Sequence, residues 1–393
     1  MHHDTAKPFE LTERQKTLSL AAVIAAAFGI GLSFGVGLPL TSLTFEAWSQ
    51  PKWVIGLAGA LPSLAILLVL PLVPRLVARL GAVASILLGC LIGAAGFVAL
   101  YLFDTVPAWI AARFVMSGAL ALPWLAGETW MNAVATEATR GRVIAVYAIS
   151  FFLGFLAGPL FLDYAGLTGP IPFLMGAAGS VLACVPIILA QRLAPDLTHT
   201  QSMSIRAALA LAPIAMVSGC LGGFAEMSYL SLIPNVGLAA GLEEGQALHL
   251  LSVLTLGGIV LQFPIGGLAD KASRVDVTIA LAVLFIGLTL ALPWALQSTV
   301  WSMIIAFFLG GVILVFYTLC LVIVGEKVTP ANLAAANVAF LVMYQLGAIA
   351  GPIVSGAAMT VSPVYGFVTA VSSVMGVATL FLVWLLRRLT ASA

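Results

Sequence analysis

A series of long apolar runs restricts the fold of this chain more than any other feature of its sequence. Each run is about 20 residues or longer, enough for a helix to cross the ~30 Å hydrocarbon core of a bilayer. A spanning backbone must satisfy its own hydrogen bonds, and runs without alternation favour helices over a barrel. We therefore expect an all-α polytopic membrane protein with about twelve transmembrane helices. The expected helices span residues 18–44, 53–73, 82–103, 107–134, 142–163, 170–191, 206–233, 246–268, 276–297, 299–325, 333–357 and 364–387.

The composition excludes a water-soluble protein. Of the residues, 62% are hydrophobic and 8% are charged, whereas a soluble domain carries roughly 25% charged residues. The first run, residues 18–40, is too long for the core of a signal peptide, so we expect a retained helix. All four cysteines lie inside apolar runs, which indicates buried small residues rather than disulfides or metal ligands.

The basic residues fix an expected orientation. If the N-terminus is cytoplasmic, every lysine and arginine except Lys52 and Arg113 falls on the cytoplasmic side. The outer loops then carry acidic residues instead, among them Asp104 and Asp163. This segregation predicts a multi-pass protein of a bacterial inner membrane with both termini in the cytoplasm.

The chain repeats itself at an offset of about 193 residues. The matching residues are Gly154, Gly158 and Pro159 in the first copy and Gly347, Gly351 and Pro352 in the second. We expect a cytoplasmic segment (1–17), two six-helix bundles (18–191 and 206–388) and a cytoplasmic linker (192–205). Two such halves are typical of transporters that rock around a site at the membrane midplane.

A glycine-rich segment separates the eighth and ninth expected helices. It contains Gly266, Asp270, Lys271 and Arg274, and its aspartate could pair with a nearby arginine in one conformational state only. This residue order resembles the signature loop of the major facilitator superfamily, and the resemblance extends over essentially the whole chain. The first-half copy, the turn expected at residues 74–81, keeps the bases and the glycine but has no acid, which implies a one-sided gate.

Further motifs resemble parts of the same superfamily. Arg113 takes the place of an arginine that the family links to proton coupling in antiporters, but the glycine expected four residues later is Ser117. The glycine-proline motif at 154–159 resembles the family's antiporter motif, and close helix packing with a kink is the compatible alternative. The segment 128–132 followed by 140–142 resembles the YcaD-like bacterial branch. The resemblance implies a carrier that works as a monomer by alternating access.

Three charged residues fall within expected helices away from the helix ends, where each costs roughly 2.5–3.5 kcal/mol on insertion scales and so normally faces a cavity or a partner. Arg113 and Glu128 lie on one stripe of the fourth helix, and Glu226 lies in the seventh. The functional interpretation is that Glu226 loads and releases a proton and responds to Arg113 or to a cationic solute. The alternatives are a static salt bridge between the halves or an acid near the surface. His249 is interpreted as interfacial, and Glu326 as solvated.

Polar and aromatic residues predict a cavity lining with few fixed polar groups, which suits amphipathic solutes better than sugars. Its candidate residues are Trp124, Tyr147, Phe151, Tyr229, Gln262, Tyr317, Asn337, Tyr344 and Gln345. The sequence has no phosphate-binding loop, no hydrolase or metalloprotease motif and no basic stretch of nucleic-acid type. We therefore expect no enzyme, cofactor or metal, and partners limited to a small solute, protons and the lipid bilayer.

These observations predict a secondary active transporter, with proton-coupled efflux of drug-like or metabolite compounds as the first hypothesis. Proton-coupled import of a small metabolite is the runner-up, because the motifs do not fix the direction. A membrane-embedded enzyme and a non-transporting sensor or assembly factor are further alternatives. A sensor would keep its activity when the intramembrane charges are neutralised, whereas a proton-coupled carrier would fail.

Overall fold

The computed structural model describes residues 11–136, 139–195, 213–269, 271–327 and 330–391, and what it describes is helical. Twelve of the described helices are long and apolar enough to cross a membrane. The elements are α1 (Glu13–Ala47), α2 (Lys52–Val69), α3 (Val73–Leu80), α4 (Ala82–Leu102), α5 (Val106–Val134), α6 (Arg140–Ala165), α7 (Ile171–Leu189), the 3-10 turn η1 (Gln191–Leu193), α9 (Pro213–Ala239), α10 (Glu244–Ala269), α11 (Arg274–Ala295), α12 (Thr299–Lys327), α13 (Pro330–Met359) and α14 (Pro363–Ala391).

The helix boundaries differ from expectation at three places. The turn expected at residues 74–81 is instead the short helix α3, whose Val73 and Val77 are buried one turn apart while Arg75 and Arg79 are exposed. Helix α1 starts at Glu13 rather than near residue 18, and Thr12 caps it with a capping box. Helix α9 extends to Ala239 rather than ending near residue 233. Most of the expected linker, residues 196–205, lies outside the described residues.

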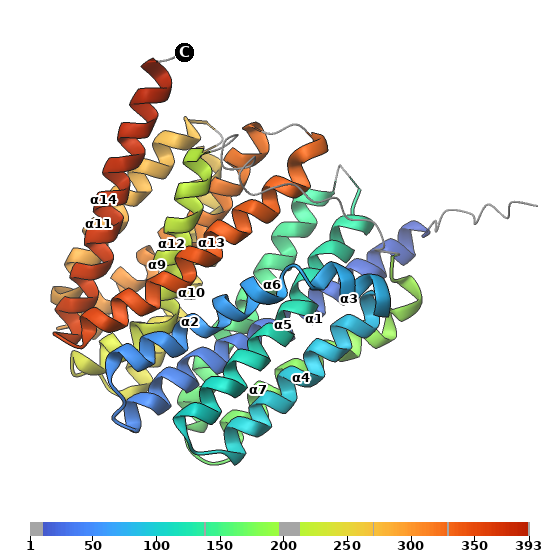
Figure 1. Ribbon diagram of the computed structural model, residues 1–393, viewed down its shortest axis with the longest axis horizontal. Helices are drawn as coiled ribbons and strands as arrows, with labels where there is room; N and C mark the ends of the chain where they lie inside the picture. Colours follow the sequence, from blue (N-terminus) through green and yellow to red (C-terminus); the bar gives the residue numbers. More distant parts are fainter. Residues whose placement is uncertain (1–10, 137–138, 196–212, 270, 328–329, 392–393) are drawn as a thin grey trace, which may run out of the picture.

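The helices form two bundles, α1–α7 and α9–α14, which repeat the same internal crossing (Figure 1). In the first bundle Gly154 and Gly158 of α6 lie against the backbone of α1, and in the second Gly347 and Gly351 of α13 lie against α9. At each of these glycines a Cβ atom would overlap main-chain atoms of the facing helix, at Gly158 those of Gly35. The repeated glycines therefore lie where helices cross most closely.

Replacing one of these glycines should destabilise the bundle. We expect Gly158→Val to lower stability by about 1–3 kcal/mol, because the side chain would overpack the α1–α6 crossing. The thermal unfolding midpoint of the purified protein in detergent measures this change. The control is Gly287→Ala in α11, since a Cβ there would meet no described atom within 4 Å. Equal midpoints for the two variants would contradict the crossing geometry.

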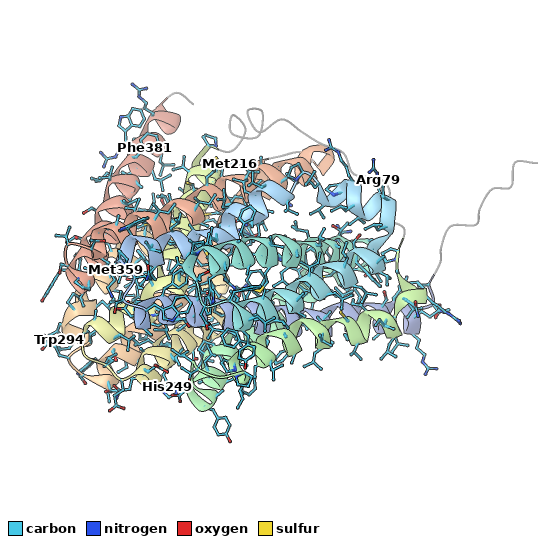
Figure 2. The ribbon with its side chains drawn as sticks, turned by 60° about the horizontal axis from the view of Figure 1, so that its bottom comes forward. Arg79, Met216, His249, Trp294, Met359 and Phe381 are labelled. Carbon is cyan, nitrogen blue, oxygen red and sulfur yellow. The ribbon has the colours of Figure 1, made fainter. Side chains whose placement is uncertain are left out.

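The two bundles touch at one side of the molecule. We call the side where α1 begins and α14 ends the termini side, and the opposite side the far side. Figure 2 places His249, Trp294 and Met359 toward the far side and Arg79 and Met216 toward the termini side. In Figure 1 the bundles converge at the lower left, which is the far side, and spread apart toward the termini side.

Close contacts between the helix pair α2 and α13 show how the far side is closed. A Cβ on Gly56 would overlap the carbonyl oxygen of Pro352, and a Cβ on Gly356 would overlap the Cα atom of Gly56. Ser231 of α9 also donates a hydrogen bond of 3.4 Å to the carbonyl oxygen of Gly59 in α2. The described state is thus closed at the far side, with the bundles apart at the termini side.

Candidate functional site

Two carboxylates, one from each bundle, occupy the facing sides of the bundles. Glu128 lies near the termini-side end of α5, and Glu226 is the middle residue of α9. Glu128 is half-buried, and Glu226 is 9% exposed. We use the term central site for these two acids and the aromatic residues around them, which are Trp124, Tyr147, Tyr317 and Tyr344.

The surroundings of Glu128 come from α5 and α6. The indole Nε1 of Trp124 donates a hydrogen bond of 2.9 Å to Oε1 of Glu128. The two residues are four apart on one helix, so they meet on the same face. The hydroxyl of Tyr147 in turn donates to the carbonyl oxygen of Trp124 at 3.3 Å. Glu128 is therefore held among aromatic groups that donate hydrogen bonds.

The surroundings of Glu226 come from α12 and α13. The Tyr344 hydroxyl forms a hydrogen bond with the Glu226 carboxylate. The Tyr317 ring lies edge-on to that of Tyr344, with 5.0 Å between the ring centroids. Tyr317 interacts electrostatically with both Glu226 and Glu128, although the two acids belong to different bundles. Tyr317 is therefore near both acids.

Neither acid has a basic partner within the described part of the chain. The salt bridges there that involve a lysine or arginine join Lys16 to Glu13, Lys52 to Glu46 and Arg274 to Glu326. Unpaired carboxylates at this depth are costly to keep charged, which is typical of groups that bind a proton or a cation.

Arg113 lies apart from this pair, inside the first bundle. Its side chain is 1% exposed and lies against Gly37 of α1. No described residue gives its Nε or Nη2 a hydrogen-bond partner. The pairing between Arg113 and Glu226 that the sequence suggested is not formed in this state, and Ser117, on the same stripe, is likewise buried without a described partner for its hydroxyl.

The other expected lining residues divide into two groups. Tyr229 packs inside the second bundle, where its hydroxyl donates to Oγ1 of Thr289 at 2.9 Å and its ring lies edge-on to Phe285 and Phe367. In this state Tyr229 is therefore buried within the second bundle and does not join the central site. Phe151 and Gln262 are half-buried, Gln345 is 2% exposed, and Asn337 has an Oδ1 atom without a described partner.

The glycine-rich segment of the second bundle is mostly helical. Gly266 and Gly267 belong to the last turn of α10, and nothing described would contact a Cβ on either of them. Lys271 is exposed, while Asp270 lies outside the described residues. Arg274 forms a salt bridge with Glu326 of α12, so Glu326 is paired rather than simply solvated. This ion pair stays within one bundle.

Polar contacts across the far side were not predicted from the sequence. Nδ2 of Asn235 in α9 donates to Oε2 of Glu46 at 3.0 Å and to the carbonyl oxygen of Ser42 at 3.1 Å, both in α1. Nε2 of His249 in α10 lies 3.1 Å from Oδ2 of Asp163 in α6. We call these two contacts the far-side latch. The sequence pattern of a loop acid or a histidine at a helix end is the same whether or not the residue forms a pair. Only the three-dimensional arrangement therefore identifies the latch.

Weakening the latch should favour opening at the far side. The Asp163–His249 pair is partly exposed, so its loss should cost about 0.2–1 kcal/mol, or up to about a fivefold shift in the conformational equilibrium. We expect Asp163→Asn to increase by that factor the rate at which Ser252→Cys, in a background without other cysteines, reacts with a maleimide from the far side. Asp104→Asn, in an exposed loop, is the control. No change in rate relative to that control would show that the pair does not hold the bundles together.

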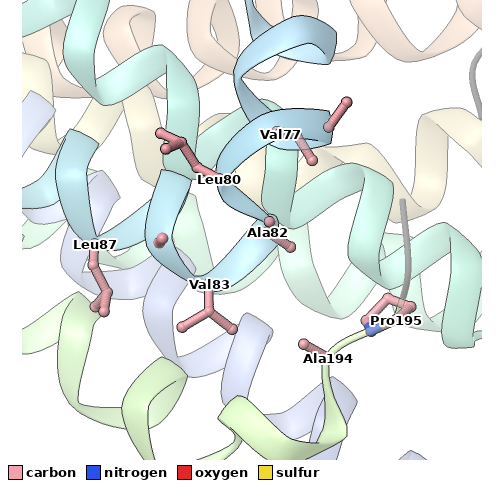
Figure 3. A pocket seen from close by; sticks show the side chains of 10 residues that line it. Val77, Leu80, Ala82, Val83, Leu87, Ala194 and Pro195 are labelled. Atoms are coloured by element: carbon pink, nitrogen blue, oxygen red, sulfur yellow. The ribbon is translucent and has the colours of Figure 1, made fainter. Parts of the chain in front are cut away.

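Two pockets lie away from the central site. One, of about 450 Å³, lies between α3, α4 and the stretch 194–195, and its lining is apolar (Figure 3). The other, of about 340 Å³, lies where α1, α5 and α6 meet near the termini side, with Lys16 and Arg142 in its lining. Neither pocket is lined by Glu128 or Glu226, and neither is lined by residues of the second bundle.

Comparison with known proteins accounts for this architecture. The sequence model described as the Major Facilitator Superfamily matches the chain at residues 18–248 and again at 215–393. The chain belongs to the major facilitator superfamily. Members of this superfamily are secondary transporters that carry small solutes across membranes, and they are not enzymes.

This superfamily member has bacterial relatives that are similar along most of their length. The uncharacterized MFS-type transporter YfkF of Bacillus subtilis is 25% identical over 338 residues, covering 83% of this chain and 85% of YfkF. The uncharacterized MFS-type transporter YcaD of Escherichia fergusonii is 28% identical over 307 residues, covering 77% and 78%. The chain is thus a multi-pass transporter of the YcaD-like branch, as the motif resemblance implied.

Solved structures of the superfamily share the fold of this transporter. The nucleoside transporter NupG superposes with a TM-score of 0.72 and 17% identity, covering 93% of this chain and 98% of NupG. A bacterial homolog of the human lysosomal transporter Spinster gives a TM-score of 0.72 and 14% identity, covering 95% and 96%. At this identity the likeness concerns the fold alone.

Proposed function

We propose that this transporter exchanges protons for a small organic solute and exports that solute from the cytoplasm across a bacterial inner membrane. The observation that carries the proposal is the central site, with one acid from each bundle and no described base paired to either. Groups placed between two moving bundles are available to whichever side is open. Import of a solute together with protons is the alternative direction.

The orientation belongs to the same proposal. The basic residues gather on the termini side, which by the charge rule is cytoplasmic. The described state is then inward-facing, because the bundles meet on the far side. The rocking units are the two bundles expected at residues 18–191 and 206–388, and the protein works as a monomer.

The cycle follows from the geometry. In the inward-facing state a cytoplasmic solute displaces protons from Glu128 and Glu226 and occupies the central site. The bundles then close at the termini side while the far-side latch breaks, and protons from outside replace the solute. The transporter with bound solute or bound protons must change between its two states more readily than the empty, charged transporter. Otherwise protons and solute would cross the membrane without coupling.

A proton-flux assay tests the proposal. Purified protein is placed in liposomes that hold a pH-sensitive dye, a pH gradient is imposed, and cationic, neutral and anionic solutes are added in turn. We expect at least one solute to move protons through the wild type and none to do so through the double variant Glu128→Gln, Glu226→Gln. Solute uptake that proceeds equally fast with and without the gradient would refute proton coupling.

A further inference from the structure

We infer that the central site recognises organic cations that carry an apolar or aromatic body. This inference rests on the proposed function, because it names the class of solute that the central site would hold. It depends on three features of that site: the sign of its charge, the placement of its aromatic rings and the kind of polar atoms it leaves unpaired.

The charge of the central site is negative. Glu128 and Glu226 approach it from opposite bundles, and Tyr317 interacts with both. The one basic residue described within the core of a span, Arg113, is buried against Gly37 of the first bundle and pairs with neither acid. Two carboxylates without a counter-charge repel anions and attract a positive charge, or else they bind protons.

Aromatic side chains lie next to both acids. Trp124 donates to Glu128, and the Tyr344 hydroxyl bonds to Glu226. The Tyr317 ring lies 5.0 Å from the Tyr344 ring and 5.4 Å from the Phe340 ring, measured between centroids. Electron-rich ring faces next to carboxylates attract a cation by about 0.5–2 kcal/mol for each ring. Two acids among these rings would cost free energy in a core that serves only for packing, so their presence favours a binding role.

The unpaired polar atoms also favour a cation. Oδ1 of Asn337, seven residues before Tyr344 on α13, is a buried acceptor without a partner in the described chain. Three donors of the site are already engaged: Trp124 with Glu128, Tyr344 with Glu226, and Tyr147 with the carbonyl oxygen of Trp124. A sugar or a carboxylate solute needs free donors at the protein surface, whereas a protonated amine or a quaternary cation needs acceptors and ring faces.

Cation recognition gives the exchange a simple chemical basis. A carboxylate neutralised by a proton no longer attracts a cation, and a carboxylate paired with a cation no longer attracts a proton. The two ligands therefore compete for Glu128 and Glu226, and each leaves when the other binds. No bond other than the carboxyl O–H is made or broken in this step.

A pair of probes with matched shape and opposite charge tests the inference. Tetraphenylphosphonium and tetraphenylborate are offered to the purified full-length protein in detergent, and equilibrium binding is measured. We expect saturable binding of the phosphonium, at least about tenfold weaker in Glu128→Gln and in Glu226→Gln, and no saturable binding of the borate. The control Glu244→Gln, at an exposed position on the far side, should bind as the wild type does.

A second variant pair tests the aromatic contribution. Tyr317→Phe keeps a ring and should retain binding, while Tyr317→Leu should weaken it about tenfold, in line with the loss of one desolvated ring face. Equal binding by these two variants, borate binding as tight as phosphonium binding, or no saturable phosphonium binding would each overturn the inference. Proton flux driven by neutral or anionic solutes would still uphold the proposed function in those cases, so the two failures are distinguishable.

Discussion

Glu226→Gln is expected to reduce solute-driven proton movement in liposomes to the level of protein-free vesicles. The amide has nearly the shape of the carboxyl group and still accepts a hydrogen bond from Tyr344, but it cannot bind and release a proton. Because Glu226 stands at the middle of α9 between the bundles, a bypass around it is not expected. The readout is the initial rate of the internal pH change after solute addition.

Two controls show that this loss comes from chemistry and not from misfolding. Glu244→Gln removes an exposed far-side carboxylate and should leave the rate unchanged. The Glu226→Gln protein should elute as the wild type does on size exclusion and unfold at a similar temperature. A rate equal to that of the wild type would move the proton site to Glu128 or out of the central site.

Arg113→Met is expected to make the purified protein more stable and at the same time to impair transport. In the described state Nε and Nη2 of Arg113 lack a partner among the described residues, and the side chain is almost fully buried. Replacing this buried guanidinium with an uncharged side chain should stabilise the protein by up to about 2.5–3.5 kcal/mol, which is the insertion cost of one charge. Methionine fills much of the same space without a charge.

The two effects of Arg113→Met are measured separately. Thermal unfolding in detergent gives the stability, and the proton-flux assay gives the activity. Arg79→Met on the exposed face of α3 serves as the control and should change neither. A lower unfolding midpoint for Arg113→Met would show that the guanidinium stabilises the first bundle, and retained activity would exclude a role in the transport cycle.

The sequence predicts the fold of this transporter better than its site. The twelve membrane helices follow from the lengths of the apolar runs, and the repeated glycine-proline motif identifies the two halves. The short helix α3 was missed because its eight residues make only about two amphipathic turns, with exposed arginines among the apolar positions, and so do not form a long apolar run. Individual charges such as Glu128 and Glu226 are visible because an acid in an apolar run costs free energy and therefore indicates a role.

The sequence does not show which face of each helix points toward the other bundle. Tyr317 and Tyr229 are both tyrosines in apolar helices, yet Tyr317 lies near both acids and Tyr229 packs inside a bundle. Successive residues of a helix point in directions about 100° apart, so the packing of neighbouring helices decides which side chains face the other bundle. The Asp163–His249 contact likewise depends on how α6 meets α10.

Solute accumulation driven by a pH gradient tests the central claim most directly. Liposomes with the wild-type protein are loaded with buffer more acidic than the outside, and the internal concentration of a labelled organic cation is followed to steady state. An antiporter whose cation and protons exchange at the central site should accumulate the cation inside, above the external concentration, and lose it when the gradient is collapsed. The control with Glu128→Gln and Glu226→Gln together corrects for passive distribution of the label. Equal steady-state levels for the wild type with and without the gradient would contradict proton-coupled exchange.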